Sequence, residues 1–206
     1  DTRQLAQHTT HDRAEAEVVA WTGSSPSLAS MSAVGTASSP AFIDSKSLLH
    51  LSELALTMLT ARRAPAAETN VLLSPRVTAL LVGACLAPCL DETLVLSGLS
   101  ALAAPGMRKL GSALIQLEDR PTTDGFGTFF FDDEGQLASG CRLIENGMVV
   151  ATLGGQGRAL ARRRTGRLGD SWRGVASNLV LAAGKGSMSE LIAEMKDGIV
   201  VDGPVS

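Results

Sequence analysis

The sequence predicts an α+β fold in which a β-rich, antiparallel sheet domain carries a few packed helices. Asn146 and Gly147 stand between two apolar, β-branched runs and give the strongest short-range signal for a two-residue β-hairpin turn. Helical spacing of apolar residues over 45–63, and Ser187 followed by Glu190 in a capping box, predict two helices. With 206 residues, 45% of them apolar, the chain is long enough for one large or two small domains.

The first third of the chain predicts a strand and a helix separated by a less regular stretch. Residues 14–21 alternate small or charged with apolar side chains, which favours a half-buried strand. Residues 23–40 are rich in Ser, Gly and Pro, so we expect a loop or linker, with an edge strand over 28–34 as the alternative. Asp44 or Ser45 is expected to cap the helix over 45–63. Its apolar face comprises Leu48, Leu51, Ala55, Met58 and Leu59, while Arg62 and Arg63 complement its C-terminal dipole and Pro65 stops it.

The remaining chain predicts alternating short strands and helices. A strand over 70–73 precedes Pro75, which opens a helix carrying 77–85 that is expected to be buried on most sides. The apolar run 77–90 is too short to cross a bilayer and is expected to be a buried segment. Further strands are expected over 112–118, 178–183 and 199–201, with a β-meander over 125–153. The Ser187 helix is expected to end at a Gly198 cap. Its predicted apolar face comprises Met188, Leu191, Ile192 and Met195.

Composition excludes several classes of partner and favours one compartment. The net charge of −3 gives no global attraction for nucleic acid or an anionic membrane, and the absence of Tyr removes a stacking platform for single strands. We therefore expect no nucleic acid and no membrane partner. Three cysteines without a dense framework favour a reducing compartment, so the cytoplasm is the expected location.

Several ordered motifs resemble the C-terminal domain of the TldD/TldE (PmbA) metallopeptidase family. The resemblance rests on the run FDDEG at 131–135, LIENG at 143–147, Thr165-Gly166 with Arg173, SMSELIAEMKDGIVV at 187–201, and Leu73-Ser74-Pro75 upstream. It implies a TldD/PmbA-like domain over 67–206, preceded over 1–66 by the end of an N-terminal or central α+β region. Because the family's closing strands would follow residue 206, we expect the domain to be incomplete at its end.

In catalytic members of that family, a helix after the Leu-Ser-Pro-like turn carries H-E-x-x-x-H, with two zinc-binding histidines and a Glu acting as general base. Here Gly83 and Pro88 stand where the histidines would be, and Ala84 stands where the Glu would be. None of these side chains can bind zinc or move a proton. The resemblance therefore implies a TldE-like member with no catalytic, cofactor-binding or metal-binding residues of its own.

The other candidate residues favour structural roles. Cys85 and Cys89 lie four apart but are only two ligands, so we expect them in the core, and Cys141 is expected to pack in a strand rather than act as a nucleophile. His8 and His11 lack a third ligand nearby, and His50 is expected to be a surface or satisfied histidine. No G-x-S-x-G elbow or phosphate-binding P-loop occurs.

Two charged segments are open to more than one interpretation. Asp132, Asp133 and Glu134 are expected to serve a turn rather than bind a cation. The segment 158–173 is the one dense basic patch, and a solvated face or subunit interface is favoured over phosphate binding. Its arginines are Arg158, Arg162, Arg163, Arg164, Arg167 and Arg173.

The resemblance implies a catalytically silent subunit of a heterodimeric zinc metallopeptidase that acts on unfolded or modified peptides. A TldD-like partner would supply the zinc, and the silent subunit would help hold an extended peptide by strand addition to a sheet edge. One alternative is a stand-alone peptide-binding or scaffold protein without a peptidase role. A second is an independent hydrolase that uses Cys141 or an unrecognised site.

Overall fold

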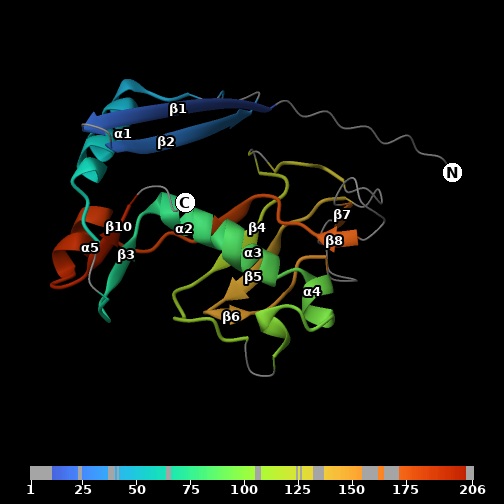
Figure 1. The fold of residues 1–206 in the computed structure, drawn as a ribbon. Helices are drawn as coiled ribbons and strands as arrows, with labels where there is room; N and C mark the ends of the chain where they lie inside the picture. The colour runs from blue at the N-terminus through green and yellow to red at the C-terminus, as the bar shows by residue number, and fades with distance from the viewer. Residues whose placement is uncertain are drawn as a thin grey trace. The chain divides into compact units, whose positions relative to one another are not determined.

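The computed structural model describes residues 11–22, 25–36, 40, 42–63, 66–104, 108–123, 125, 127–131, 137–154, 162–164 and 172–202. These residues fall into two compact units (Figure 1). We call Leu81–Gly184 the sheet unit, and His11–Leu80 together with the segment from Lys185 onward the hairpin unit. The mixture of helices with mainly antiparallel sheets confirms the predicted α+β fold.

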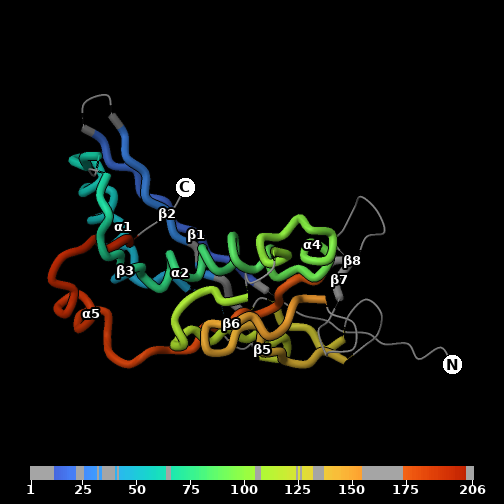
Figure 2. Tube along the Cα trace, turned by 90° about the horizontal axis from the view of Figure 1, so that it is seen from below, coloured from blue at the N-terminus to red at the C-terminus, as the bar shows by residue number. Residues whose placement is uncertain are grey.

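The hairpin unit begins with a long antiparallel pair, β1 (His11–Thr22) and β2 (Ser25–Thr36) (Figure 2). The predicted strand over 14–21 is confirmed, but the loop predicted over 23–40 is wrong and the edge-strand alternative is right. The Ser- and Ala-rich β2 has weak strand propensity of its own. It is held instead by an unbroken register with β1, from Thr22 opposite Ser25 to His11 opposite Thr36.

Helix α1 (Ser45–Leu59) packs against this hairpin. Asp44 caps it, because its side chain accepts a hydrogen bond from the Ser47 amide at 2.7 Å. The helix ends four residues before the predicted Arg63, because Thr60 leaves helical geometry and its Oγ1 donates to the Thr57 carbonyl. Leu51 and Ala55 are buried against Ala20 and Ala29, whereas Leu48 and Met58, which were predicted on the apolar face, are exposed.

A second layer of the hairpin unit pairs β3 (Val71–Leu73) in parallel with β10 (Ile199–Val201). Helix α5 (Met188–Glu194) precedes β10, and Ser187 and Glu190 form the predicted capping box. Met195, the residue after the helix, is its C-cap, so the predicted Gly198 cap is wrong. Gly198 serves close packing instead, because a Cβ there would lie 2.7 Å from the Asn70 carbonyl oxygen. Leu191 and Ile192 are exposed, so the predicted apolar face is only partly covered.

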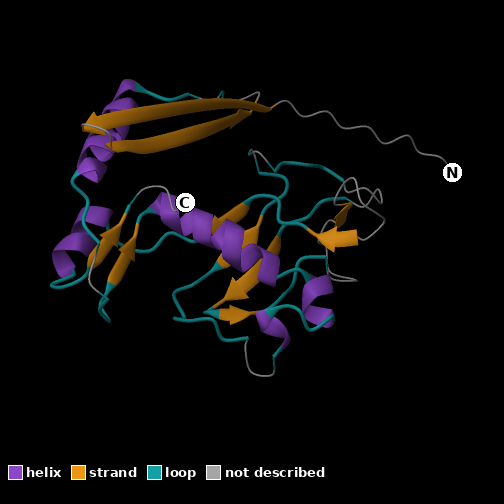
Figure 3. Ribbon diagram, viewed as in Figure 1, coloured by secondary structure: helices purple, strands orange, loops and turns teal. Residues whose placement is uncertain are grey.

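Helix α2 (Pro75–Leu81) begins with proline at its first position, as predicted, and continues into a π-helical turn, η1 (Val82–Leu86). A short helix, α3 (Ala87–Cys89), then leads to α4 (Glu92–Leu96) and the 3-10 turn η2 (Ala101–Ala103) (Figure 3). The run 77–90 was predicted to be a buried segment, but Leu80 and Leu81 are exposed while Val77 and Leu90 are buried. A continuous apolar run carries no periodicity, so the sequence does not indicate which side is covered. No helix among the described residues is long and apolar enough to cross a membrane.

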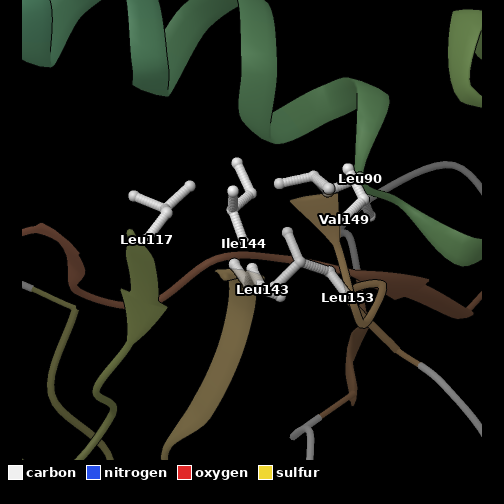
Figure 4. Close-up of a cluster of buried hydrophobic side chains, with 6 residues drawn as sticks. All are labelled: Leu90, Leu117, Leu143, Ile144, Val149 and Leu153. Carbon is white, nitrogen blue, oxygen red and sulfur yellow. The ribbon is translucent and has the colours of Figure 1, made fainter. Parts of the chain in front are cut away.

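The sheet unit is built on a four-stranded antiparallel sheet with the order β6-β5-β4-β9. Its strands are β4 (Leu117–Asp119), β5 (Cys141–Glu145), β6 (Met148–Val149) and β9 (Leu179–Leu181). A separate two-stranded pair joins β7 (Arg162–Arg164) to β8 (Trp172–Gly174). One buried cluster holds the unit together, and Figure 4 shows its side chains: Leu90, Leu117, Leu143, Ile144, Val149 and Leu153.

The hairpin turn at Asn146 and Gly147 is confirmed, with left-handed φ values of 49° and 72° joining β5 to β6. The wider meander predicted over 125–153 is wrong, because outside this hairpin its described part forms only two isolated bridges, between Phe131 and Leu137 and between Leu153 and Asp91. The predicted turn at Asp132, Asp133 and Glu134 lies outside the described residues. The strand predicted over 112–118 begins only at Leu117, because residues 112–115 form a turn.

Candidate functional site

A pocket of about 450 Å³ lies within the sheet unit. Three parts of the chain line it: the helical stretch 83–94, Leu153 in the loop after β6, and the extended segment 174–179 that leads into β9. Its lining residues are Gly83, Ala87, Pro88, Asp91, Leu94, Leu153, Gly174, Val175, Ala176, Ser177 and Leu179.

The helical wall owes its geometry to the π-helical turn. The Ala87 amide donates to the Val82 carbonyl, a hydrogen bond that spans five residues instead of four. In a regular α-helix, residues five apart point about 140° away from each other. Here Gly83 and Pro88 line the same pocket, whereas Ala84 is exposed and is not part of the lining. The structure thus brings together two of the three positions that the motif comparison singled out.

Gly83 leaves open space at this wall, because a Cβ built there meets no heavy atom within 4 Å. The glycine is therefore not required by close packing. Pro88 is accommodated near the start of α3, where a missing amide donor is tolerated.

The opposite wall is fixed to the helical stretch by backbone hydrogen bonds. The Leu153 amide donates to the Leu90 carbonyl at 2.7 Å, and the Glu92 amide donates to the Leu153 carbonyl at 2.9 Å. Gly174 passes so close that a Cβ on it would lie 2.0 Å from the Leu153 carbonyl oxygen. This position therefore requires glycine, and the spacing of the two wall segments depends on it.

The segment entering β9 is anchored by Asp119, whose side chain is buried in β4. One Asp119 oxygen accepts hydrogen bonds from the Ser177 amide at 2.9 Å, the Ser177 hydroxyl at 2.6 Å and the Asn178 amide at 2.9 Å. This buried carboxylate is thus well satisfied. It holds Ser177 in the pocket wall from behind.

Asn178 extends the same support toward the loop after β4. Its Oδ1 accepts a hydrogen bond from the Gly127 amide at 2.9 Å, and its Nδ2 donates to the Thr123 carbonyl at 3.1 Å. A Cβ on Gly127 would lie 2.1 Å from the Ser177 carbonyl oxygen. Two polar side chains and a glycine therefore fix the position of this wall.

Among the described residues of the lining, Asp91 is the charged one, and it is 5% exposed. The Arg-bonded acid of the sheet, Glu118, is not a lining residue. A hydrogen bond from Arg120 at 2.9 Å is the main cause that lowers the pKa of Glu118, with Arg142 adding to it. The described lining of the pocket is mostly apolar and includes one carboxylate.

The residues at this site do not fit a zinc ion. Gly83, Ala84 and Pro88 carry no side-chain donor atom. Among the residues that the structure describes, no group of three or more His, Cys, Asp or Glu side chains is arranged to hold a metal. No metal chemistry is therefore assigned to this pocket.

The cysteines differ from one another in their surroundings. Cys85 is exposed, so its predicted core location is wrong; the π-helical turn leaves its side of the helix uncovered. Cys89 is half-buried and its Sγ contacts the Cys85 carbonyl at 3.2 Å. Cys141 packs against the sheet unit's core cluster, as predicted.

The histidines and the arginine segment take no described part in the pocket. His50 is on the surface, as predicted, with its Nε2 3.7 Å from the Asp202 carboxylate. His8, Arg158 and Arg167 lie outside the described residues, and His11 begins β1. The backbone of 162–164 forms β7, and that of Arg173 lies in β8.

Sequence reasoning missed the pocket and its carboxylate. The lining comes from residues far apart in the chain, so no local pattern predicts it. The only signal available was that Asp91 follows an apolar run and precedes a helix, which is typical of an N-cap. In the structure Asp91 is the N-cap of α4, since it accepts a hydrogen bond from the Thr93 amide at 2.9 Å.

Comparison with known families shows to which family this chain belongs. The model of the PmbA/TldA metallopeptidase C-terminal domain matches residues 66–206. The chain belongs to the TldD/TldE/PmbA family. Its PmbA/TldD-type domain includes the whole sheet unit, and with it the pocket.

Two archaeal relatives support the assignment to this family. A metalloprotease of Methanothermobacter thermautotrophicus is 29% identical over 157 residues, which cover 73% of this chain and 35% of that protein. A metalloprotease of Methanocaldococcus jannaschii is 27% identical over 158 residues, covering 72% of this chain and 35% of the relative. The chain thus spans about a third of the length of the curated relatives that it matches.

A solved structure shares the fold. TldE from Thermococcus kodakarensis superimposes with a TM-score of 0.69 at 20% identity, over 95% of this chain and 46% of that one. At this identity the likeness shows the fold alone. It agrees with the TldD/PmbA-like α+β domain that the motifs imply.

Proposed function

We propose that this PmbA/TldD-type chain is a catalytically silent, peptide-holding subunit of a two-component zinc metallopeptidase. The observation that carries the proposal is the pocket at Gly83 and Pro88. Two positions expected to hold zinc-binding histidines line one cavity, yet they carry glycine and proline there. In this proposal a TldD-like partner supplies the zinc and the general base.

The open edge of the sheet supports a role in holding an extended peptide. Within the described part of the chain, β9 pairs with β4 on one side only. The Arg120 amide donates to the Asn178 carbonyl and the Ala182 amide donates to the Gln116 carbonyl, both at 3.0 Å. The backbone hydrogen-bonding groups of Asn178 and Ala182 thus point toward β4. Those of the intervening Leu179 and Leu181 point away from β4, toward the open edge of the sheet. Those groups match what strand addition requires.

The expected substrate is an unfolded or modified peptide, because main-chain hydrogen bonds select an extended backbone rather than a sequence. No disulfide joins the three cysteines, which fits a reducing compartment, and we place the complex in the cytoplasm.

The two-component proposal is tested by mixing the purified chain with a TldD-like protein and following cleavage of an unstructured peptide. We expect cleavage to require both proteins and to stop when a zinc chelator is added. Elemental analysis of the separated proteins is expected to find zinc with the partner alone. Equal cleavage by the partner without this chain would refute the two-component role. Stoichiometric zinc in this chain would refute the proposal that it is catalytically silent.

A matched pair of variants connects the assay to the pocket. Gly83→Leu projects into open space at the pocket wall and is expected to reduce cleavage by the mixture without loss of folding. Gly184→Leu, where a Cβ also meets nothing within 4 Å, serves as the control because Gly184 does not line the pocket. If both variants cleave like the unaltered chain, the pocket is not part of the peptide-holding surface.

The exposed apolar side chains favour a scaffold role as the second candidate function. Leu96, Leu99 and Leu114 are 80%, 78% and 88% exposed, which is unusual for aliphatic side chains. Size-exclusion chromatography separates the two candidates. A stable self-assembly that ignores the TldD-like protein favours the scaffold, whereas a mixed complex favours the silent subunit.

A further inference from the structure

The pocket is apolar on nearly all sides but contains one incompletely paired carboxylate. Ala87, Pro88, Leu94, Leu153 and Leu179 supply carbon surface. Asp91 is 5% exposed, and its Oδ1 accepts a hydrogen bond from the Thr93 amide at 2.9 Å. Among the described residues, no hydrogen bond or ion pair reaches its other oxygen. A buried carboxylate oxygen without a partner is costly, and a bound cation would remove that cost.

Asp91 differs from Asp119, the equally buried carboxylate at 4% exposed, in its position. Oδ1 of Asp119 accepts three hydrogen bonds from Ser177 and Asn178, which fix the segment that enters β9. Asp119 is not among the described lining residues, whereas Asp91 lines the cavity and keeps an acceptor for an incoming group.

We propose that this pocket binds an aliphatic chain ending in a primary ammonium group, namely a lysine side chain of the held peptide, with Asp91 as its counter-charge. The methylene groups of lysine suit the apolar walls, and its ammonium suits a single free carboxylate oxygen. Arginine is less suitable. Its guanidinium pairs best with both oxygens of a carboxylate, and Oδ1 of Asp91 is already occupied by the α4 cap.

The size of the cavity agrees with this occupant. A volume of about 450 Å³ lies in the lower part of the range of small-molecule sites. The wall segment that contributes Gly174 to Ser177 continues directly into β9. A peptide added along β9 would therefore run beside the segment that forms this wall, and this inference rests on the proposed peptide-holding function.

Isothermal titration calorimetry of the full chain with two acetylated, alanine-rich heptapeptides tests the inference. One peptide has a central lysine, and the other has norleucine, which has the same length without the charge. We expect the lysine peptide to bind about tenfold more tightly, the size of one partly desolvated charge contact. Equal affinities would overturn the lysine assignment and leave the peptide-holding function standing.

Asp91→Asn removes the charge while keeping an N-cap, because asparagine caps helices as well as aspartate does. The variant is expected to bind both peptides equally. Asp44→Asn makes the same chemical change at the N-cap of α1, a residue of the other unit that is not in the pocket lining, and is expected to keep the full preference. Retention of the preference in Asp91→Asn would overturn the role of Asp91.

A small-molecule arm separates failure of this inference from failure of the peptide-holding function. If neither peptide binds, the peptide-holding function fails. The pocket is then tested by adding n-butylammonium chloride to the chain and following backbone amide signals by NMR, with n-butanol as the uncharged control. Shifts of the Ala87, Leu94 and Ala176 amide signals that vanish in Asp91→Asn support an amine site. No shifts, or equal shifts with n-butanol, overturn it.

Discussion

The two units solve the problem of core packing in different ways. The sheet unit buries a cluster of large aliphatic side chains, including Leu117, Leu143 and Ile144, at 0% exposure. In the hairpin unit, the cluster that joins α1 to the β1–β2 hairpin buries Ala20, Ala29 and Ala55 around one larger side chain, Leu51. Because buried carbon area supplies most of the stabilisation, the sheet unit has the stronger core and the hairpin unit relies more on close backbone approach. The pocket lies in the unit with the stronger core, which holds its walls in place.

The largest expected effect comes from a substitution in the core of the sheet unit. Leu143→Ala removes a fully buried side chain and is expected to lower the free energy of unfolding by about 2–5 kcal/mol, from lost burial and the cavity left behind. Urea unfolding followed by circular dichroism measures the change. Leu137→Ala, at a position 79% exposed, is the control and is expected to change stability by at most about 0.5 kcal/mol. Equal effects of the two variants would contradict the assignment of the core.

The hairpin unit is expected to fail in the opposite way, by overfilling. Ala29 is 0% exposed and packs with Ala55, so Ala29→Leu leaves no space for the extra atoms. We expect a loss of about 1–3 kcal/mol in the free energy of unfolding. Leu28, the neighbouring residue, is 49% exposed, and Leu28→Ala is expected to have little effect. A neutral Ala29→Leu variant would show that α1 is not closely packed on the hairpin.

A pair of glycines tests how closely the pocket walls approach. Gly174→Ala places a Cβ 2.0 Å from the Leu153 carbonyl oxygen and is expected to cost about 1–3 kcal/mol, because backbone must move. Gly83→Ala meets nothing within 4 Å and lies in a helical turn, so it is expected to be neutral or to stabilise by about 0.5–1 kcal/mol. Thermal and urea unfolding of both variants measure this difference. Similar changes in the two would contradict the described spacing of the walls.

Local signals predicted the elements whose chemistry lies within a few residues. The Asn146-Gly147 turn needs left-handed φ values that these residue types adopt readily, and the Ser187–Glu190 capping box is completed within one turn. Both could be read from the sequence. The Asp44 cap and the Pro75 helix start belong to the same class.

Features that depend on partners distant in sequence could not be predicted. β2 is Ser- and Ala-rich and becomes a strand through pairing with β1. In the helical run 77–90, exposed and buried positions carry the same apolar residue types, so the pattern does not show which side is covered. The candidate site is the extreme case. Asp91, Leu153 and Gly174 meet only in the folded chain, so the motif comparison identified Gly83 and Pro88 but not the cavity that they line.

The smallest expected effect concerns acid titration and contrasts the units once more. In the sheet unit the hydrogen bond from Arg120, with a contribution from Arg142, lowers the pKa of Glu118. In the hairpin unit the Ser187 amide, 2.6 Å away, is the main cause that lowers the pKa of Glu190. A folded-state pKa below the unfolded value means that each acid stabilises the fold fully above about pH 4.3, and that this stabilisation is lost as the pH falls through the folded-state pKa.

Salt is expected to separate the two acids. The partners of Glu118 are arginine side chains at the surface, whose attraction is screened by added ions, whereas Glu190 is held by a backbone amide one turn away. Urea unfolding of Glu118→Gln and Glu190→Ala between pH 2 and pH 7, at low and high sodium chloride, measures the loss. The difference between Glu118→Gln and the unaltered chain above pH 5 is expected to shrink in high salt. The difference between Glu190→Ala, which removes the acceptor of the Ser187 amide, and the unaltered chain is expected to persist. If salt reduced both differences equally, the Glu190 interaction would be mainly long-range electrostatics, and the described capping box would not be its cause.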